Sequence, residues 1–511
     1  MPHARVLLLS PPTAVVSTEP LLNLGYLAAA LRQHGHDVRV VDATAPYRPY
    51  SEQEIFDLVR EYQPHFIGIT LTIDNVDRSY LFLEKLAQLK VPIVTGGPHP
   101  NSRPKESLAH GAQIVCMGEG EVTIVELAEY FLGQRPLAAI HGISYCDETG
   151  RQVFTAPRAA IADLDTIPFP DFGDFPIRHY TGSDSPESNP MFWSIFSSRG
   201  CPFNCIFCSS HNVFGRKIRF RSAKNVLAEI ELLVKRFGIK SIGFQDDEIL
   251  CRKDRFIEFC DLLQASGLNV KISFRTRIDS IDADLLAKAR ATGVKRLSFG
   301  IESWEDETLR RIKKNYDVKT IHSHFKILSD DHSWPVSFNN IVGFPWETRK
   351  HYQNIVNEIA LIPRNIRIYP NVLTPIPYPQ TELYDQYHAG HGFTDWWLSG
   401  QSNSDSVAPQ TEPPFFMLLA ASFVPLYQKN KYWKFSLKQE KDLQWFSWKV
   451  FALFLRSHCR PAERRLVYVL CYSSWWLWRI EPRIEAVFFD SLKGSSWVAG
   501  LKKRLRFRDQ Y

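Results

Sequence analysis

Residues 198–208 read SRGCPFNCIFC and place three cysteines, Cys201, Cys205 and Cys208, close together. The chain has nine cysteines in 511 residues, and the others lack the close spacing of metal ligands. A structural zinc ion normally takes four ligands, and His211 would supply the fourth. Buried thiols are a second alternative. Three thiolates can instead bind three irons of a [4Fe–4S] cluster and leave the fourth iron open to a cofactor.

The first 140 residues alternate between short apolar runs and segments with helical periodicity. Strands are predicted at RVLLL, DVRVVDA, HFIGITL, VPIVTGG and AQIVCMG, and helices after the first run and near 51–62, 75–89 and 121–132. This alternation predicts an α/β domain with a doubly wound parallel sheet of Rossmann or flavodoxin-like type.

Ligands of such sheets bind at the carboxyl ends of the strands, where this chain has polar or glycine-rich loops. The candidate binding residues there are Thr70, Thr72, Gly96, Gly97, His99, Gly118, Glu119 and Gly120. The alternative for each single loop is an ordinary turn without a ligand, because Gly and Pro are common in connections between strands and helices. His65 precedes the third strand, so we expect it to be a strand-entry residue.

The C-x₃-C-x₂-C pattern, with the aromatic residue Phe207 before its last cysteine, resembles that of radical S-adenosylmethionine (SAM) enzymes. The resemblance implies that the open iron binds the amino and carboxylate groups of SAM. One electron from the cluster then cleaves SAM to methionine and a 5′-deoxyadenosyl radical. It also implies a partial (β/α)6 barrel, and six strand and helix units follow the cysteines, with helices expected at 222–237, 254–265, 282–291, 319–329 and 350–360.

The same resemblance implies roles for residues at the strand ends of the barrel. Glu302, in GIES, is the candidate for the SAM ribose or amino group, and Arg277, in RTRID, for its carboxylate. Asp246 and Asp247, in QDDE, are expected on the substrate or cofactor side. Each of these side chains could instead be an ordinary charge or salt-bridge partner at a loop end.

The loops of the first domain resemble those of the cobalamin-binding domain that precedes the catalytic domain in many radical SAM enzymes. The resemblance implies that they hold the corrin and its nucleotide tail, with His99 placed to contact the tail. The motif Asp-x-His-x-x-Gly, which supplies a histidine to cobalt in some of these domains, is absent from this chain. No histidine is therefore assigned to the metal.

The chain is expected to contain a cobalamin-binding domain at 1–140, a linker at 141–187, a radical SAM domain at 188–390 and a mostly helical domain at 391–511. The last segment is rich in aromatic residues (DWW, QWFSW, SSWWLW) and basic near its end (LKKRLRFR). Aromatic helices usually form cores or domain interfaces. The alternative is a peripheral contact with a lipid surface.

Composition limits the other functional classes. The net charge of +6 is modest for this length and does not call for a nucleic-acid partner. The apolar run in MPHARVLLLSPP is too short for a signal segment, and no apolar run reaches the roughly 18 residues of a membrane span. An odd number of cysteines argues against a disulfide framework. We therefore expect a cytoplasmic protein.

These features predict a cobalamin-dependent radical SAM methyltransferase that acts on an unactivated carbon of a small-molecule or lipid-like substrate. The resemblance implies that transfer proceeds through a 5′-deoxyadenosyl radical and methylcobalamin, with an electron donor such as flavodoxin or ferredoxin. An oxidative cyclase or rearrangement enzyme with the same cofactors is the nearest alternative. A non-catalytic protein that binds cobalamin or an iron–sulfur cluster is the alternative from another class.

Overall fold

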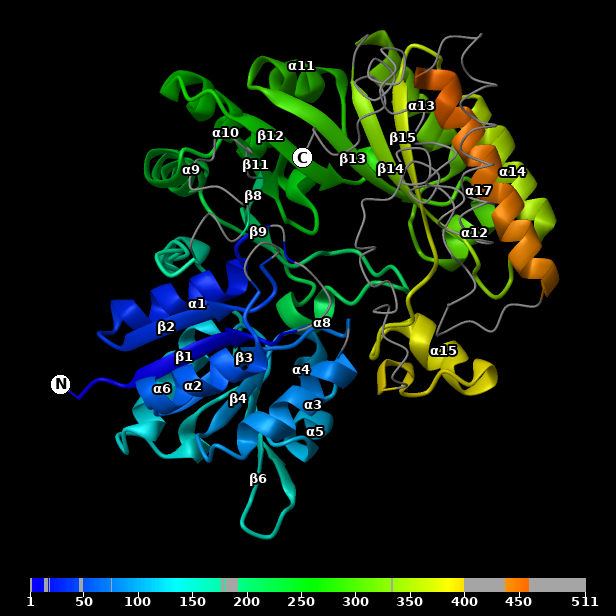
Figure 1. The fold of residues 1–511 in the computed structure, drawn as a ribbon. Helices are drawn as coiled ribbons and strands as arrows, with labels where there is room; N and C mark the ends of the chain where they lie inside the picture. Colours follow the sequence, from blue (N-terminus) through cyan, green and yellow to red (C-terminus); the bar gives the residue numbers. More distant parts are fainter. Residues whose placement is uncertain are drawn as a thin grey trace, which may run out of the picture.

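The computed structural model describes residues 2–398 and 437–458, apart from 13–16, 18, 46–48, 75, 176–179, 181–191 and 332–333. Figure 1 shows two α/β bodies, the first drawn blue to cyan and the second green to yellow, that meet near the short helix α8 (His211–Phe214). The predicted order of a doubly wound domain followed by a partial barrel is confirmed.

The first body contains a seven-stranded sheet with the order β2-β1-β3-β4-β5-β6-β7. Its strands are β1 (Arg5–Ser10), β2 (Asp37–Asp42), β3 (Phe66–Thr70), β4 (Ile93–Gly96), β5 (Ile114–Cys116), β6 (Ile143–Cys146) and β7 (Gln152–Phe154). The first five are parallel, as the alternation of strands and helices predicts. In β1, Val6 packs into one apolar core and Leu7 into another, because successive side chains point to opposite faces of a sheet.

Helices cover both faces of this sheet. They are α1 (Leu22–Gln33), α2 (Glu52–Tyr62), α3 (Val76–Ala87), α4 (Pro98–Ser102), α5 (Pro104–Ala109) and α6 (Glu121–Phe131), with 3-10 turns at Leu137–Ala139 and Leu164–Thr166. Buried residues of α1 and α6 belong to one core, and those of α2 and α3 to the other. Ser51 and Glu54 form a capping box that fixes the start of α2.

The sheet runs past the boundary predicted at residue 140. β6 pairs antiparallel with β5, and β7 pairs antiparallel with β6, so the segment predicted to be a linker begins with a hairpin of the first domain. The hairpin turn is closed by Asp147, whose Oδ1 accepts hydrogen bonds from the backbone N–H groups of Thr149 and Arg151, each at 3.0 Å. The first domain therefore reaches residue 154 rather than 140.

The second body is a six-stranded parallel sheet with the order β15-β14-β13-β12-β11-β8. Its strands are β8 (Phe192–Ile195), β11 (Ser241–Phe244), β12 (Lys271–Thr276), β13 (Val294–Glu302), β14 (Pro335–Ile341) and β15 (Arg367–Leu373). Its helices are α9 (Ala223–Phe237), α10 (Lys253–Ser266), α11 (Ala283–Ala291), α12 (Asp306–Arg311), α13 (Val318–Asp330) and α14 (Arg349–Ala360), with 3-10 turns at Ile249–Arg252 and Ile278–Ser280.

Between β8 and α9, a small hairpin carries the cysteine motif. Its strands are β9 (Ser198–Arg199) and β10 (Arg219–Phe220), which pair antiparallel. Gly200 has a φ of 91°, and a Cβ there would lie 2.7 Å from the carbonyl oxygen of Lys217. Only glycine fits this close approach just before the first cysteine.

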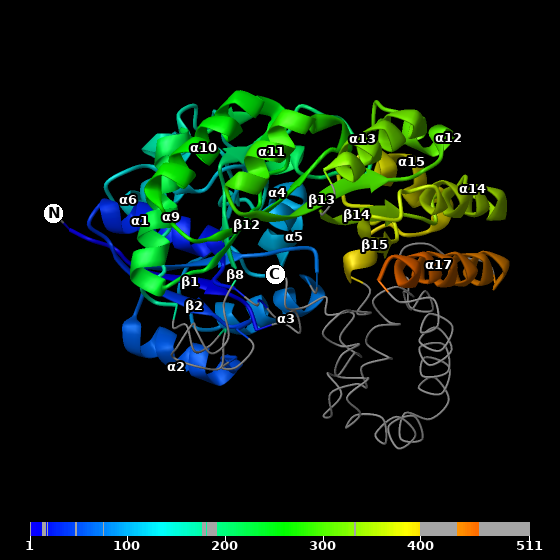
Figure 2. The ribbon, with the colours of Figure 1, turned by 90° about the horizontal axis from the view of Figure 1, so that it is seen from above.

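The last described helix packs on the second body, whereas the helix before it and the turn that follows also contact the first body, where Arg103 lies over the rings of Tyr384 and Trp397. α15 (Glu382–His391) is followed by a 3-10 turn at Trp396–Leu398, and α17 (Leu437–His458) lies alongside α14 in Figures 1 and 2. Phe446 of α17 contacts Tyr352 of α14, with ring centroids 5.7 Å apart. Residues 399–436 and 459–511, which hold SSWWLW, LKKRLRFR and the predicted lipid contact, lie outside the described residues. Among the described helices, none has the length and apolarity to cross a membrane.

Candidate active site between the two domains

The loop that carries the three cysteines is fixed by backbone hydrogen bonds to two distant helices. The Ile206 N–H donates to the carbonyl oxygen of Ile312 at 3.3 Å, after the last turn of α12. The carbonyl oxygen of Ile206 accepts from the N–H of Leu383 in α15 at 2.9 Å. The loop is therefore held between the segment after α12 and the start of α15.

The three thiols of this loop are partly buried, and Sγ of Cys205 lies 4.0 Å from the carbonyl oxygen of Lys313. Burial raises the pKa of Cys201 to about 12, so metal binding must displace its proton. The sulfur atoms of the three cysteines do not all lie within 4.8 Å of one another. Among the described residues, only Glu305, Glu307 and His351 bring three ligand atoms of His, Cys, Asp or Glu that close together. Thiolates on one tetrahedral zinc would lie about 3.8 Å apart, given Zn–S bonds of about 2.3 Å. The wider spread of the three thiols suits a cluster better than a single ion.

Arg277 lies beside the cysteine loop, at the carboxyl end of β12. Its guanidinium carbon is 3.9 Å from the ring centroid of Phe203, in the cysteine loop, and 4.9 Å from that of Tyr316. Its Nη2 donates to the carbonyl oxygen of Lys314 at 2.6 Å and to Asp279 at 2.8 Å. Its Nη1 is buried and has no hydrogen-bond partner among the described residues. This donor is available to an anionic group at the cysteines.

Glu302 ends β13 with a φ of 70°, a left-handed conformation that is unusual for a residue other than glycine. The side chain is buried, and its Oε1 lies 3.7 Å from Nζ of the buried Lys314. Burial raises the pKa of Glu302, and the cation of Lys314 opposes that shift. The strained backbone and the buried ion pair together hold a carboxylate near the cysteine loop.

The three acidic residues after β11 have different roles. Asp246 accepts hydrogen bonds from the Ser197 N–H at 3.0 Å and the Ser197 hydroxyl at 2.7 Å, and also from the hydroxyl of Ser198, so its carboxylate fixes β9. Glu248 accepts from the backbone N–H of Arg277 at 2.8 Å. Asp247 lines the cavity between the domains. Of the two aspartates expected on this side, Asp247 lines the cavity, whereas Asp246 is turned toward β9.

A cavity of about 500 Å³ lies between the carboxyl ends of the first sheet and the cysteine loop. From the first domain, its wall includes the predicted residues Thr70, Thr72, Gly96, Gly97, Gly118, Glu119 and Gly120. From the second domain, it includes Phe196, Arg199, Ser209, Ser210, Val213, Phe214 and Asp247. The wall therefore continues directly from Cys208 into the next two residues of the chain.

Two features of this cavity suit a large ligand that approaches the backbone closely. Gly97 has a φ of 101°, and a Cβ there would lie 2.8 Å from the carbonyl oxygen of Leu71. Thr95 lines the cavity, and its hydroxyl is buried and has no hydrogen-bond partner among the described residues. An unpartnered polar atom of this kind indicates that a ligand group completes the site.

Two predicted residues point elsewhere. The imidazole of His99 is fully buried, and its Nε2 lies 3.0 Å from Glu106 Oε2, beside the rings of Tyr80 and Trp397. It does not line the cavity, so we assign it a packing role in place of the predicted contact with a nucleotide tail. Phe207 is half-buried and packs against an apolar core that the two domains share.

A buried ion network joins the two domains beside the cavity. Arg199 of β9 donates to Glu119 at 2.8 Å and to Glu121 at 2.5 Å, and Arg219 of β10 donates to Glu119 at 2.7 Å. Burial alone would raise the pKa of Glu119, but the hydrogen bonds from the two arginines outweigh it and hold the pKa below its usual value. We call these four side chains the interdomain latch.

Sequence reasoning missed the latch arginines, Lys314 and Thr95. Arg199 precedes Gly200 and Cys201 directly, and this position beside the motif was the one available signal. Lys314 lies in the charged segment RRIKKNYD, where the sequence pattern does not distinguish it from the partly exposed Lys313 beside it. Thr95 reads as an ordinary strand residue, because burial without a partner is visible only in three dimensions.

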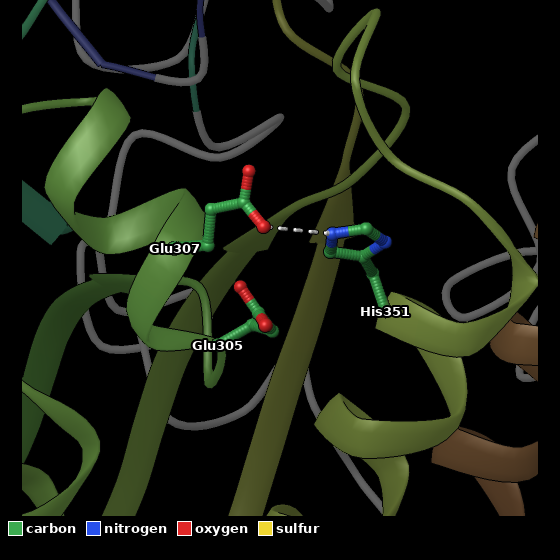
Figure 3. Close-up of side chains that lie close together, drawn as sticks. All are labelled: Glu305, Glu307 and His351. Carbon is green, nitrogen blue, oxygen red and sulfur yellow. Dashed lines mark ion pairs between the residues drawn. The ribbon is translucent and has the colours of Figure 1, made fainter.

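A second group of ligand-type side chains lies on the outer helices. Figure 3 shows Glu305 and Glu307 near His351, and Oε2 of Glu307 is 3.7 Å from Nε2 of His351. Glu305 also accepts a hydrogen bond from the N–H of Thr308 at 3.0 Å at the start of α12, and Glu307 pairs with Arg311 at 2.5 Å. These groups have protein partners, so we assign them to the packing of α12 against α14.

The sequence matches two family models in the order that the fold shows. The B12 binding domain matches residues 13–128, and the Radical SAM superfamily matches residues 195–359. An uncharacterised methyltransferase of Pyrococcus horikoshii is 30% identical over 391 residues, which cover 75% of this chain and 82% of that protein. The chain belongs to the cobalamin-binding radical SAM enzymes. Its cofactors are accordingly a [4Fe–4S] cluster, SAM and cobalamin.

Two further comparisons are with a curated relative and with a solved structure. An anaerobic magnesium-protoporphyrin IX monomethyl ester cyclase of Synechocystis is 28% identical to this chain. The alignment covers 66% of this chain and 70% of the cyclase. A solved structure of the cobalamin-dependent SAM radical enzyme OxsB, with aqua-cobalamin and SAM bound, has a TM-score of 0.64 and 15% identity. That alignment covers 96% of this chain and 75% of the OxsB chain, and it shows a shared fold.

The residues of the site fit all three cofactors. The three thiols offer the donors of a cluster, and the unpartnered Nη1 of Arg277 offers a donor for the SAM carboxylate. Thr95 and Gly97 offer a hydroxyl and an open stretch of backbone to cobalamin.

Proposed function

We propose that this protein is a radical SAM methyltransferase that adds a methyl group to an unactivated carbon of a small molecule. The observation that carries the proposal is the shared wall between the cysteine loop and the interdomain cavity: Ser209 and Ser210 line the cavity and follow Cys208 directly. A methyl donor in the cavity and a radical source at the cysteines would then act on one substrate. When bound, the cofactors supply a 5′-deoxyadenosyl radical and a transferable methyl group.

The chain's own side chains would orient SAM and the substrate. Arg277 would hold the SAM carboxylate through Nη1, because its other donors already bond Asp279 and the backbone of Lys314. The carboxylate of Glu302 would accept from the SAM amino group or ribose, and Lys314 fixes its position. Asp247, which lies in the cavity wall, would face the space between the two cofactors.

The test is the stoichiometry of SAM products in the anaerobically reconstituted full-length protein. With cobalamin, a reductant, methyl-labelled SAM and a small-molecule extract, each methylated product should accompany one S-adenosylhomocysteine and one 5′-deoxyadenosine. Cys205→Ala should lose 5′-deoxyadenosine, because it removes a cluster ligand. Cys251→Ala should retain it, since Cys251 is exposed and lies outside the motif. A product with 5′-deoxyadenosine but no added methyl would reject methyl transfer.

The second candidate is an oxidative cyclase or rearrangement enzyme with the same cofactors. The likeness to the Synechocystis cyclase favours it, because that relative covers two thirds of this chain. The same experiment separates the two reactions, since a cyclase consumes SAM without forming S-adenosylhomocysteine in each turnover.

Either reaction needs an electron for the cluster, and we infer a small donor protein such as flavodoxin or ferredoxin. We also infer a cytoplasmic location. The seven cysteines in the described part of the chain are all free thiols, which persist in a reducing compartment.

A further inference from the structure

A second cavity, of about 440 Å³, lies on the inner face of the six-stranded sheet. Residues of five successive strands line it, and most of them are polar: Gln245, Ser273, Arg275, Arg296, Ser298, Ser337, Asn339 and Asn371. We call this space the lumen cavity. Neither the cysteine loop nor the residues proposed to hold SAM line it.

The register of the sheet places the lumen cavity deeper in the barrel than the cysteines. Arg275 precedes Arg277 by two residues on β12, so its backbone lies about 7 Å further from the carboxyl end of the strand. Arg296 precedes Glu302 by six residues on β13, which corresponds to roughly 20 Å of extended chain. A molecule in the lumen cavity can therefore extend from the arginines toward SAM.

The two arginines dominate the charge of this space. Arg296 is buried, and its guanidinium carbon lies 5.6 Å from the ring centroid of Tyr369, which holds the long side chain in place. Arg275 is exposed, and its cation opposes the raised pKa of Glu302, which ends the neighbouring strand β13. Arginine side chains bind carboxylate and phosphoryl oxygens in a bidentate manner, which makes them suitable anchors for such groups.

Among the described residues, the one acidic side chain in the wall comes from the first domain. Glu19 accepts a hydrogen bond from the Ser194 hydroxyl at 2.8 Å, and Ser194 in turn accepts from the amide of Gln245 at 2.8 Å. The other carboxylate oxygen of Glu19 is buried and has no partner among the described residues. It can accept a hydrogen bond from a hydroxyl or amino group of a bound molecule. The cavity therefore offers cations at its wall and an acceptor beside them.

We propose that the lumen cavity binds the anionic end of the substrate, a carboxylate or phosphoryl group, through Arg275 and Arg296. This inference rests on the proposed function and narrows its substrate to polar molecules that carry an anion. A substrate held in this way would present the carbon atoms beyond its anionic group to the site at the cysteines. A wholly apolar molecule would cover the cation of Arg275 without offering it a hydrogen-bond acceptor, which is costly.

The experiment is equilibrium dialysis of the reconstituted full-length protein, saturated with SAM and cobalamin, against labelled inorganic phosphate or labelled succinate. The two probes separate a phosphoryl site from a carboxylate site. The wild-type protein should bind at least one of them, and Arg275→Gln and Arg296→Gln should each weaken that binding by tenfold or more, because each removes charge-assisted hydrogen bonds. Arg367→Gln is the matched control, because Arg367 begins β15, is exposed and does not line the cavity.

Comparison of the two arginine variants separates a loss of anion binding from misfolding and from a loss of SAM. Arg275 is exposed, so Arg275→Gln should fold even if the loss of the buried Arg296 destabilises the barrel. SAM affinity is measured in each variant, and a loss of SAM binding without a loss of probe binding would assign the cavity to SAM and overturn the proposal. Equal probe binding in all variants, or no binding in the wild type, would also overturn it. None of these results depends on methyl transfer, so the reaction type is tested separately.

Discussion

At the scale of single residues, the guanidinium group of Arg277 is held in place by the protein while one of its hydrogen-bond donors is left for a ligand. The stack between Phe203 and Tyr316 and the bonds to Asp279 and Lys314 fix the guanidinium group. One nitrogen remains buried without a partner among the described residues. A buried donor left unpaired costs about 1–3 kcal/mol, which a ligand carboxylate would recover on binding.

We expect Arg277→Gln to weaken SAM binding by about 10- to 100-fold, because a charge-assisted hydrogen bond is worth about 1.5–3 kcal/mol. The cluster should assemble normally, since Arg277 supplies no thiolate. Iron content together with the SAM-induced change in the electron paramagnetic resonance spectrum measures both quantities. Arg290→Gln, which removes a surface pair with Asp331, is the control. Unchanged SAM affinity in Arg277→Gln would reject the assigned role.

The sequence could predict residues whose role follows from spacing or from position at a strand end. Cys201, Cys205 and Cys208 are of the first kind, and most of the cavity glycines are of the second. The sequence could not predict that His99 turns into the packed interior, or that the carboxylate of Asp246 is already hydrogen-bonded to Ser197. Side-chain direction depends on neighbours that are distant in the chain.

At the scale of elements, the connection between β14 and α14 is built around one buried carboxyl group. Glu347 Oε2 accepts from the backbone N–H groups of Gly343 at 2.7 Å and Phe344 at 3.1 Å, and so folds the loop back on itself. Burial raises the pKa of Glu347 to about 8, although these hydrogen bonds act in the opposite direction. The folded protein therefore retains a proton that the unfolded chain, with a pKa near 4.5, releases.

This difference predicts that the free energy of unfolding falls as pH rises from about 4.5 to about 8, on the order of 1.4 kcal/mol per pH unit from this group. Glu347→Gln should flatten that part of the profile, because an amide does not titrate and its oxygen can accept the same two hydrogen bonds. Urea unfolding at pH 5.5 and pH 8.0 measures the effect. Glu307→Gln should leave the slope unchanged, because the pKa of the partly exposed Glu307 is lowered by Arg311 and lies below this range. Parallel profiles for wild type and Glu347→Gln would contradict the prediction.

The sequence predicted the barrel helices well. The expected spans 222–237 and 350–360 correspond to Ala223–Phe237 and Arg349–Ala360, because periodic apolar faces and flanking strands mark both ends. The hairpin of β6 and β7 was missed. Its strands have four and three residues and are partly exposed, so they lack the buried alternation that identifies a strand.

At the scale of the whole molecule, the interdomain latch sets how the two cofactor domains face each other. Arg199 and Arg219 are direct partners in the β9 and β10 hairpin, and both bond Glu119 from the other domain. Removing one member of a buried ion pair leaves an uncompensated charge and typically costs about 3–5 kcal/mol. The latch is therefore expected to contribute to the docking of the domains.

Glu119→Gln should lower the free energy of unfolding by a few kcal/mol and weaken the affinity for hydroxocobalamin, because the cavity wall passes through the same loop. Since the pKa of Glu119 is lowered in the folded protein, the latch is fully effective above about pH 4.5 and is lost as the pH falls through the folded value. Calorimetry with hydroxocobalamin and urea unfolding measure the two effects. Glu129→Gln, which removes a partly exposed pair between α6 and Arg135, should change both only slightly. Equal effects of the two substitutions would count against the latch.

The wall that joins Cys208 to the interdomain cavity also makes the loading of the two metal cofactors reciprocal. Ser209 and Ser210 follow Cys208 directly and line the cavity, so any change in the cysteine loop when the cluster binds would alter the cavity wall. If cluster assembly raises the affinity for cobalamin by some factor, bound cobalamin must by thermodynamic linkage raise the affinity for the cluster by the same factor. A cell that lacks either cofactor would then accumulate a protein that binds the other poorly, and maturation would be cooperative.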